Sequence, residues 1–215
     1  ENRELLANTG LRFSITNGLV LSMTGAMQTR NRLQGEFESR NSWASQQGGY
    51  QGTASRSAAQ WTDRTFESYL NYSEIFGGGH NIDAMAGYSY QDFEYESFRA
   101  RNRNFLTDDF GYNNLGAGLH LSEGIYQDDV ASFKRSNKLV AFFGRVSYNF
   151  NNTYMLSASL RHEGSSRFGD GNKWGNFPAI SAGWAISNES FMEDITAIDE
   201  LRLRVGYGVN GNQGF

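Results

Sequence analysis

Residues 142–168 read FFGRVSYNFNNTYMLSASLRHEGSSRF, and apolar and polar side chains nearly alternate over the first twenty of them. A period of two is typical of a β-strand that has one apolar face and one wet face. The apolar residues on both sides of Asn151-Asn152-Thr153 have even numbers. A three-residue loop keeps them on one face of a hairpin, and Asn tolerates the left-handed backbone that such a loop needs. The stretch therefore predicts a hairpin whose apolar face meets either a protein core or lipid.

The composition narrows the class of protein. The 215-residue sequence has no apolar run of about 18 residues, the length of a membrane-spanning helix, which excludes an α-helical membrane protein. It does not exclude a β-barrel, because a barrel strand needs apolar residues only at alternate positions. The 25 glycines, 16 phenylalanines and 11 tyrosines, with a single proline, favour strands and turns. The absence of cysteine excludes disulfides and thiolate metal sites. A net charge of −4 without a basic block argues against a nucleic-acid partner.

The same alternation recurs and predicts an all-β protein with about eight strands of about ten residues each, in four hairpins. The other three pairs of apolar segments are 11–15 with 19–27, 66–72 with 82–90, and 180–186 with 201–209. In the first pair, Ile15 opposite Leu19 predicts a three-residue loop at Thr16-Asn17-Gly18, with the glycine in the left-handed region.

Longer polar segments separate the hairpins. Stretches without periodicity cover about 29–60, 92–137 and 163–176, and we expect them to be long loops on one side of the sheet. The last pair is joined through Ser190–Glu193, which has capping-box spacing. Because Phe191, Ile195 and Ile198 recur at helical intervals, a short surface helix is expected there.

Four features favour lipid over a protein core. The strand length suits a bilayer, short turns alternate with long loops, the wet face is rich in Ser, Gly, Asn, Arg and Glu, and aromatic residues mark both ends of the apolar face. These aromatics are Tyr72, Tyr148, Phe150 and Tyr154 near the short turns, and Tyr88 and Tyr90 near the long loops. The alternative is a soluble β-sandwich, which predicts shorter loops and more closely spaced turns.

The segment from Leu139 to Asn212 carries a family resemblance. Its motifs are "FGRVSY", "YMLSASLRHEGSSRFG", "WGNFPAISAGWAIS" and "LRLRVGYGVNGN". They closely resemble the barrel of SusC/RagA-type TonB-dependent outer-membrane transporters. Upstream, "LSMTGAMQT" and "HNIDAMAGYSYQ" also resemble strands of that family.

The resemblance implies an antiparallel up-and-down transmembrane barrel of 22 strands in the outer membrane of a Gram-negative bacterium. It further implies an N-terminal plug, a SusD-like surface lipoprotein over the mouth, and import of oligosaccharides or peptides with energy from TonB. The sequence contains no plug, signal peptide or TonB-contact segment. Residues 1–215 are therefore expected to be an interior part of the barrel domain rather than a self-closing eight-stranded barrel. A small passive pore or adhesin and a soluble glycan-binding β-domain are the alternatives.

No residue pattern predicts an enzyme, a metal site or a cofactor, because the three histidines are far apart and lack ligand spacing. Four arginines of the polar strand faces either face the lumen, toward plug or substrate, or pair with carboxylates of adjacent strands: Arg145, Arg161, Arg202 and Arg204. Aromatic residues of the expected loops either contact sugar rings or the lid, or pack among the loops: Trp43, Tyr50, Phe105, Tyr112 and Trp174.

Overall fold

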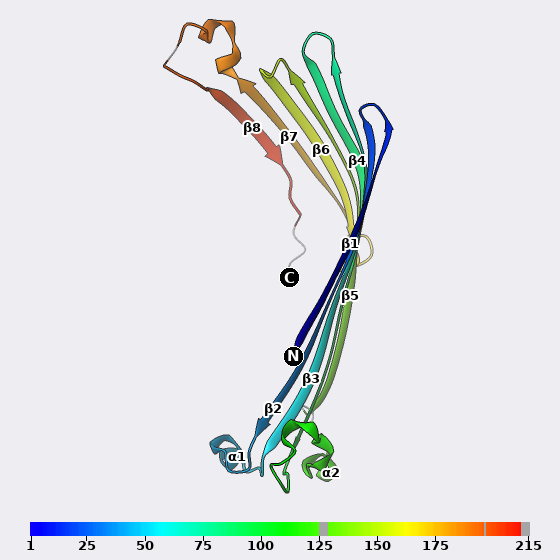
Figure 1. The fold of residues 1–215 in the computed structure, drawn as a ribbon, viewed down its shortest axis with the longest axis vertical. Coiled ribbons are helices and arrows are strands. Elements are labelled where there is room, and N and C mark those ends of the chain that lie inside the picture. Colours follow the sequence, from blue (N-terminus) through cyan, green and yellow to red (C-terminus); the bar gives the residue numbers. More distant parts are fainter. Residues whose placement is uncertain (125–128, 196, 212–215) are drawn as a thin grey trace. The chain divides into compact units, whose positions relative to one another are not determined.

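The computed structural model describes residues 1–124, 129–195 and 197–211, which form one eight-stranded sheet in sequence order (Figure 1). The strands are β1 (Asn2–Thr16), β2 (Leu19–Glu38), β3 (Thr53–Phe76), β4 (His80–Arg103), β5 (Val130–Phe150), β6 (Tyr154–Ser165), β7 (Trp174–Ala185) and β8 (Arg202–Gly208). The order confirms the predicted up-and-down segment, and it runs from β1 to β8 as an open sheet. Among the described residues, no helix is both long and apolar enough to cross a bilayer.

The helices are short and lie in the connections. They are α1 (Trp43–Gly48), α2 (His120–Glu123) and the 3₁₀ turns η1 (Gly111–Asn113), η2 (Leu115–Ala117), η3 (Ile186–Asn188) and η4 (Ser190–Met192). The prediction of a surface helix from Ser190 onward is wrong, because the described residues of this segment form only the single turn η4. Its capping residue, Glu189, makes no side-chain cap hydrogen bond, so the capping-box spacing does not produce a capping box.

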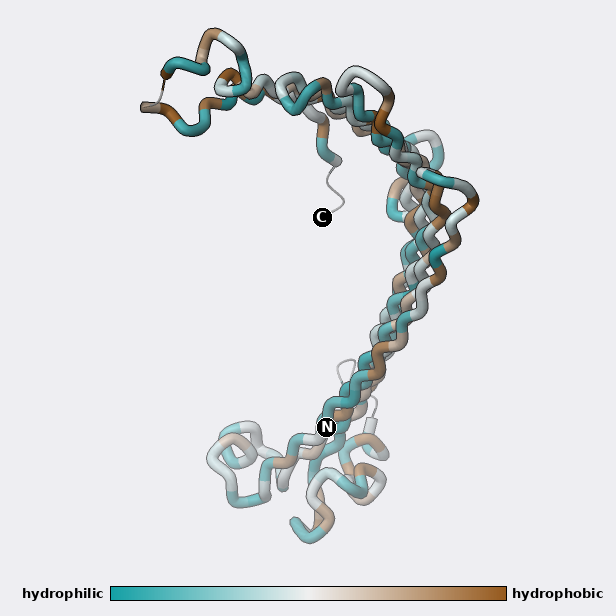
Figure 2. Tube along the Cα trace, turned by 45° about the horizontal axis from the view of Figure 1, so that its top comes forward, coloured by the Kyte–Doolittle hydropathy of each residue, from teal (hydrophilic) through white to brown (hydrophobic). Residues whose placement is uncertain are grey.

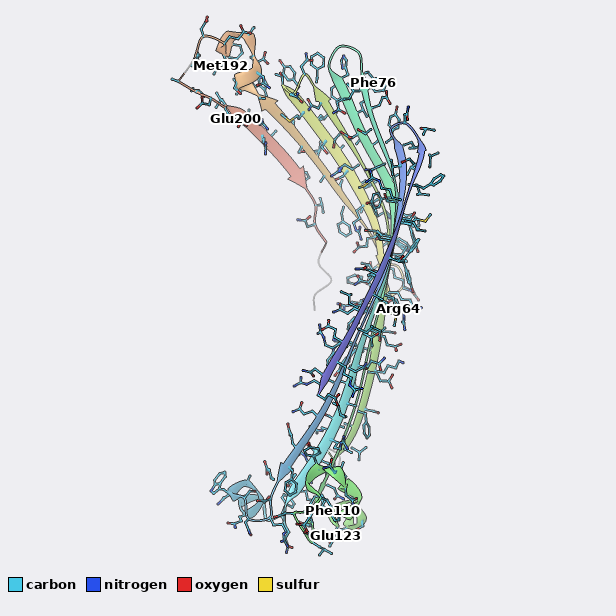
Figure 3. The ribbon with its side chains drawn as sticks, in the orientation of Figure 1. Arg64, Phe76, Phe110, Glu123, Met192 and Glu200 are labelled. Atoms are coloured by element: carbon cyan, nitrogen blue, oxygen red, sulfur yellow. The ribbon has the colours of Figure 1, made fainter. Side chains whose placement is uncertain are left out.

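The chain divides into two compact units. Unit 1 comprises Glu1–Ala7, Met27–Asp63 and Phe93–Ser136, and unit 2 comprises Asn8–Ala26, Arg64–Asp92 and Asn137–Phe215. Side chains stand out from both faces of the strands (Figure 3), and hydrophilic and hydrophobic residues interleave along them (Figure 2).

Strands β2 to β5 have 20, 24, 24 and 21 residues, so the prediction of about ten residues is wrong for them. Much of the sequence expected as loops in 29–60 and 92–137 belongs to strand ends, and the connections shrink to 39–52 and 104–129. A strand segment with water on both faces has no reason to alternate, so its sequence carries no period.

Cross-strand pairs support these polar strand ends in unit 1. The ring of Tyr95 on β4 lies 5.1 Å from that of Trp61 on β3 and 6.0 Å from that of Phe133 on β5. These ring contacts connect the three strands. On β5, Lys134 Nζ lies 3.3 Å from Glu94 and 3.2 Å from Glu96. Such pairs stabilise a sheet without a buried core.

The predicted β5–β6 hairpin is confirmed in detail. Phe150 pairs with Tyr154 across the turn Asn151-Asn152-Thr153, and both asparagines are left-handed, with φ of 51° and 56°. Asn149 Oδ1 accepts a hydrogen bond from the Asn152 N–H at 2.9 Å, which holds the turn. In the first hairpin Gly18 is also left-handed as predicted, at φ 78°, but Thr16 belongs to β1 and the turn has two residues.

The pairing register of β5 to β8 separates two faces in unit 2. One row on the apolar face is Tyr148, Leu156, Ala182 and Val205, and the row behind it on the polar face is Ser147, Ser157, Ser181 and Gly206. The apolar face is open: the exposed fraction is 49% for Leu156 and 68% for Val205. Among the described residues of unit 2, no second sheet covers this face, which contradicts the soluble sandwich.

Candidate functional site

An aromatic row crosses five strands of unit 2 on the apolar face. It lies at the edge of that face which is farther from the short turns. Phe66 lies 6.5 Å from Tyr88, and Tyr88 lies 5.4 Å from Phe142, between ring centroids. Phe142 pairs with His162, whose ring stacks on Trp174 at 4.6 Å and 6°. We call these five residues the loop-side belt. Aromatic rows of this kind are typical of the edge of the apolar band in outer-membrane barrels.

A second row lies near the short turns. The His80 ring is 4.7 Å from Phe150, and His80 Nδ1 is 2.6 Å from the Tyr148 hydroxyl. Phe150 stacks on Tyr154 at 6.4 Å, and Tyr154 pairs with Trp184 on β7. We call these five residues the turn-side belt. Tyrosine and tryptophan suit a membrane–water interface because each has an apolar body and a polar atom.

Glu189 accepts hydrogen bonds from two residues of the turn-side belt. Tyr154 Oη donates a hydrogen bond to Glu189 Oε1 at 2.5 Å, and Trp184 Nε1 donates to the same oxygen at 2.7 Å. The hydrogen bond from Tyr154, followed by that from Trp184, lowers the pKa of Glu189. The carboxylate thus fixes the β7–β8 connection to two strands at this edge.

The separation of the two belts fits a bilayer. On β6 they are marked by Tyr154 and His162, with Leu156, Ala158 and Leu160 between them on the same face. Eight residues at about 3.4 Å each, on a strand tilted by about 40°, span about 21 Å of membrane normal. This is close to the apolar band of about 25 Å found in outer-membrane barrels.

The four predicted arginines all lie on the polar face, as the register of β5 to β8 shows. Arg161 pairs with Glu163, and Arg202 Nη2 lies 2.9 Å from Glu200 Oε1. Both carboxylates come from the same chain segment, two residues away, and not from an adjacent strand.

The other two arginines differ. Within the described part of the chain, neither Arg145 nor Arg204 forms an ion pair within 4.0 Å. Arg204 lines a hollow of about 570 Å³ on the polar face, together with Asn81, Asp83 and Asn149.

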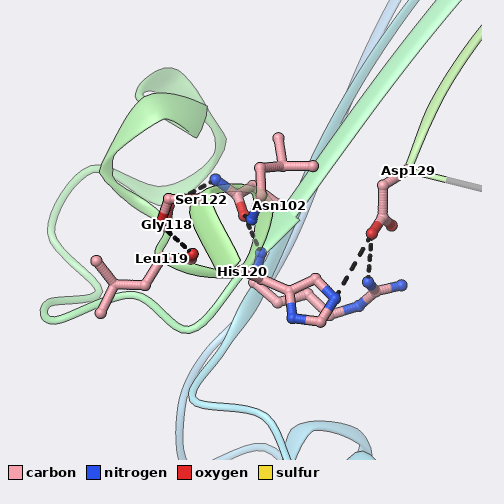
Figure 4. Close-up of polar contacts among 8 residues, drawn as sticks. Asn102, Gly118, Leu119, His120, Ser122 and Asp129 are labelled. Carbon is pink, nitrogen blue, oxygen red and sulfur yellow. Dashed lines mark hydrogen bonds and ion pairs between the residues drawn. The ribbon is translucent and has the colours of Figure 1, made fainter. Parts of the chain in front are cut away.

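In unit 1, the buried side chain of Asn102 organises the β4–β5 connection (Figure 4). Its Nδ2 donates hydrogen bonds to the carbonyl oxygens of Leu115 at 2.8 Å and Gly118 at 2.7 Å. Its Oδ1 accepts from the N–H groups of Arg103 at 2.8 Å and Leu121 at 3.1 Å. All four hydrogen-bonding positions of the amide are used. Sequence reasoning missed Asn102, because its partners lie up to 19 residues away.

Tyr50 packs among the loops. The Tyr50 ring packs edge-on against the His120 ring, with 5.5 Å between the centroids. The Arg103 guanidinium lies over the Tyr50 ring, 4.8 Å from its centroid. Arg103 Nη1 in turn lies 2.7 Å from Oδ2 of Asp129, which is fully buried (Figure 4). His120 Nε2 lies 3.7 Å from the same oxygen. Asp129 also had no signal in the sequence.

The other aromatics predicted in loops differ in their surroundings. Trp43 opens α1 and is 78% exposed, whereas Phe105 is buried and its N–H donates to the Gln51 carbonyl at 2.7 Å. The Tyr112 ring lies 5.8 Å from the Arg56 guanidinium. Trp174 is the first residue of β7 and belongs to the loop-side belt, so its expected place in a loop is wrong. It pairs with Gly164, which leaves space for the indole ring on the face.

A sequence model of the family described as TonB dependent receptor-like, beta-barrel, matches residues 4–214. The chain belongs to this family. The TonB-dependent receptor P3 of Formosa agariphila is 31% identical over 206 residues, which cover 96% of the chain and 20% of that relative. SusC of Bacteroides thetaiotaomicron is 31% identical over 149 residues, 69% of the chain and 14% of SusC. This TonB-dependent receptor segment thus spans about a fifth or less of the curated relatives' length.

The solved structures agree on the fold. The RagAB peptide transporter superposes with a TM-score of 0.79 over 96% of this TonB-dependent receptor segment and 22% of that chain, at 19% identity. The ferric citrate transporter FecA superposes with a TM-score of 0.52 at 12% identity, over 87% of the segment and 26% of that chain. The named relatives are receptors and transporters. The recognition of the family and of a barrel segment from the sequence is confirmed.

Proposed function

We propose that this chain forms barrel wall and loops of an outer-membrane importer for oligosaccharides or peptides that is driven by TonB in a Gram-negative bacterium. The observation that carries the proposal is the open apolar face between two aromatic belts about 21 Å apart. Such a face stabilises a protein in lipid and destabilises it in water. The rest of the importer, including a plug through which TonB would act, comes from sequence beyond these strands.

The partners follow from the two faces and the loops. Lipid covers the apolar face of unit 2. Arg145 and Arg204 face the lumen, where they meet the plug or passing substrate. In unit 1, exposed Trp43 and Tyr112 are the loop aromatics best placed to contact a SusD-like lipoprotein. The supporting observation is their exposure, with 78% for Trp43, compared with the packed Tyr50 and Phe105.

Site-directed spin labelling tests the lipid face. Residues 1–215 contain no cysteine, so single cysteine substitutions at Leu156, Ser157, Ala158 and Ser159 each add one labelling site to this segment, in a background whose cysteines elsewhere are replaced by serine. In the transporter that contains this chain, reconstituted into vesicles, nitroxides at 156 and 158 should be accessible to oxygen, and those at 157 and 159 to a water-soluble nickel chelate. Equal accessibility at the four sites would refute the membrane assignment.

Electrical recording separates the importer from the passive pore. A plugged importer should show almost no steady conductance in a planar bilayer without TonB. Large, permanently open conductance from the same preparation would favour the pore.

A further inference from the structure

A small pocket in unit 1 is not explained by the barrel wall. It has a volume of about 250 Å³ and lies where α1 and the residues after it cover β2, β3 and β4. The residues that matter for its chemistry are Glu36, Glu38, Tyr50, Ser55, Arg101 and Arg103. We call it the loop pocket.

The loop pocket has an acidic wall and a basic wall. Glu36 and Glu38 are two residues apart on β2, and Arg101 and Arg103 are two residues apart on β4. Residues i and i+2 of a strand point to the same side, about 6–7 Å apart. Each strand therefore presents a pair of like charges to the cavity, and the two pairs have opposite sign.

Arg103 is already engaged, since its guanidinium pairs with Asp129 at 2.7 Å and covers Tyr50 at 4.8 Å. In the described chain, Arg101, Glu36 and Glu38 make no ion pair within 4.0 Å. The pocket thus holds separated charges of both signs beside an aromatic ring.

The floor of the pocket is preformed. Tyr50 lies so close to Gly48 that a Cβ on that glycine would be 2.9 Å from Tyr50 Cδ2. Only glycine leaves room for the ring, and Arg103 holds its position by the cation–π contact. A site that is ordered before binding loses less conformational entropy when a ligand enters.

We propose that the loop pocket binds short zwitterionic peptides, with the ligand ammonium toward Glu36 and Glu38 and the ligand carboxylate toward Arg101. A planar guanidinium matches a carboxylate in two parallel hydrogen bonds. The Ser55 hydroxyl can bond the peptide amide, and Tyr50 offers apolar surface to a side chain. The volume suits one or two small residues. This assignment rests on the proposed import function and narrows its cargo to peptides, because a neutral sugar would leave both charged walls without counter-charges.

Calorimetry on the intact transporter that contains this chain tests the assignment, with dialanine as the probe. Four ligands separate the charges without altering the protein: free dialanine, its N-acetyl form, its C-terminal amide, and the doubly capped form. Each single cap should weaken binding about 10- to 100-fold, since each removes a charged hydrogen-bond partner. Maltose, a neutral disaccharide, should bind far more weakly than dialanine.

Protein variants assign each charge to a wall. Arg101→Gln should weaken free dialanine about 10- to 100-fold and leave the C-terminal amide nearly unchanged. Glu38→Gln should do the same for the ammonium, with the N-acetyl form as its insensitive ligand. Lys134→Gln is the matched control, because it removes an exposed charge of unit 1 that does not line the pocket.

Three results would overturn the proposal: no binding of dialanine, dialanine binding that both caps leave unchanged, or maltose binding that depends on Arg101 and Glu38. Because the capped ligands act on the unaltered protein, a variant that misfolds does not hide the answer. Failure here would leave the lipid accessibility of residues 156–159 unchanged, so it is distinguishable from failure of the importer assignment.

Discussion

Replacement of Asn102 by alanine should loosen the β4–β5 connection without disturbing the barrel wall. Asn102 is 1% exposed and makes four hydrogen bonds, with Leu115, Gly118, Arg103 and Leu121. At about 1 kcal/mol net for each bond, the local opening free energy should fall by about 4 kcal/mol. One factor of ten corresponds to about 1.4 kcal/mol, so amide exchange through this opening should accelerate about 1000-fold.

Hydrogen–deuterium exchange with mass spectrometry measures this on peptides covering 110–122 of the intact transporter. Asn102→Asp should also accelerate exchange, because it turns the Nδ2 donor into an acceptor that faces two carbonyl oxygens. The control is Asn113→Ala in the same connection, an exposed residue that should change exchange less than threefold. Unchanged exchange around Leu121 in Asn102→Ala would refute the reasoning, as would equal acceleration in β6 and β7.

Two further predictions concern unit 2. Hydrogen bonds from Tyr154 and then Trp184 lower the pKa of Glu189 below its ordinary value of 4.5. The ionised carboxylate therefore contributes its full stabilisation above pH 4.5, and this contribution is lost as the pH falls through the lowered pKa. Trp184 fluorescence should therefore change on acidification below about pH 4.5, and Glu189→Gln should lose this step; an identical titration in the variant would contradict it. Ala158→Arg places a charge midway between the belts and should cost about 2–4 kcal/mol of insertion, whereas Ser159→Arg on the polar face should cost little. Heat-modifiable mobility on gels reports the folded fraction of each, and equal losses would argue against a lipid face at residue 158.

The hairpin around residues 142–168 was predictable because two environments act on it at once. Lipid on one side and water on the other select alternate side chains, and the even-numbered apolar residues then fix the register and the length of the turn. The family resemblance could be recognised for the same reason, since it lies in segments under this double constraint.

The polar ends of β3 to β5 and the loop network were not predictable in this way. Trp61, Tyr95 and Phe133 are partners only once three strands are aligned, and nothing local marks them as neighbours. Asn102 and Asp129 are single polar residues whose roles come from groups brought near by the fold. The sequence places Trp174 in a loop because it follows directly on a run of glycine and charged residues.

The apolar face of unit 2 and the amide of Asn102 imply very different tolerance to mutation. Ile180 lies on the apolar face with 53% of its surface exposed. Such a position requires only an apolar side chain, so replacement by another aliphatic residue should have little effect on stability. Asn102 must supply two donors and an acceptor in a volume that few other residues match. Apolar residues of the wall should therefore exchange one at a time with little effect, whereas a single change at Asn102 should disorder the whole β4–β5 connection.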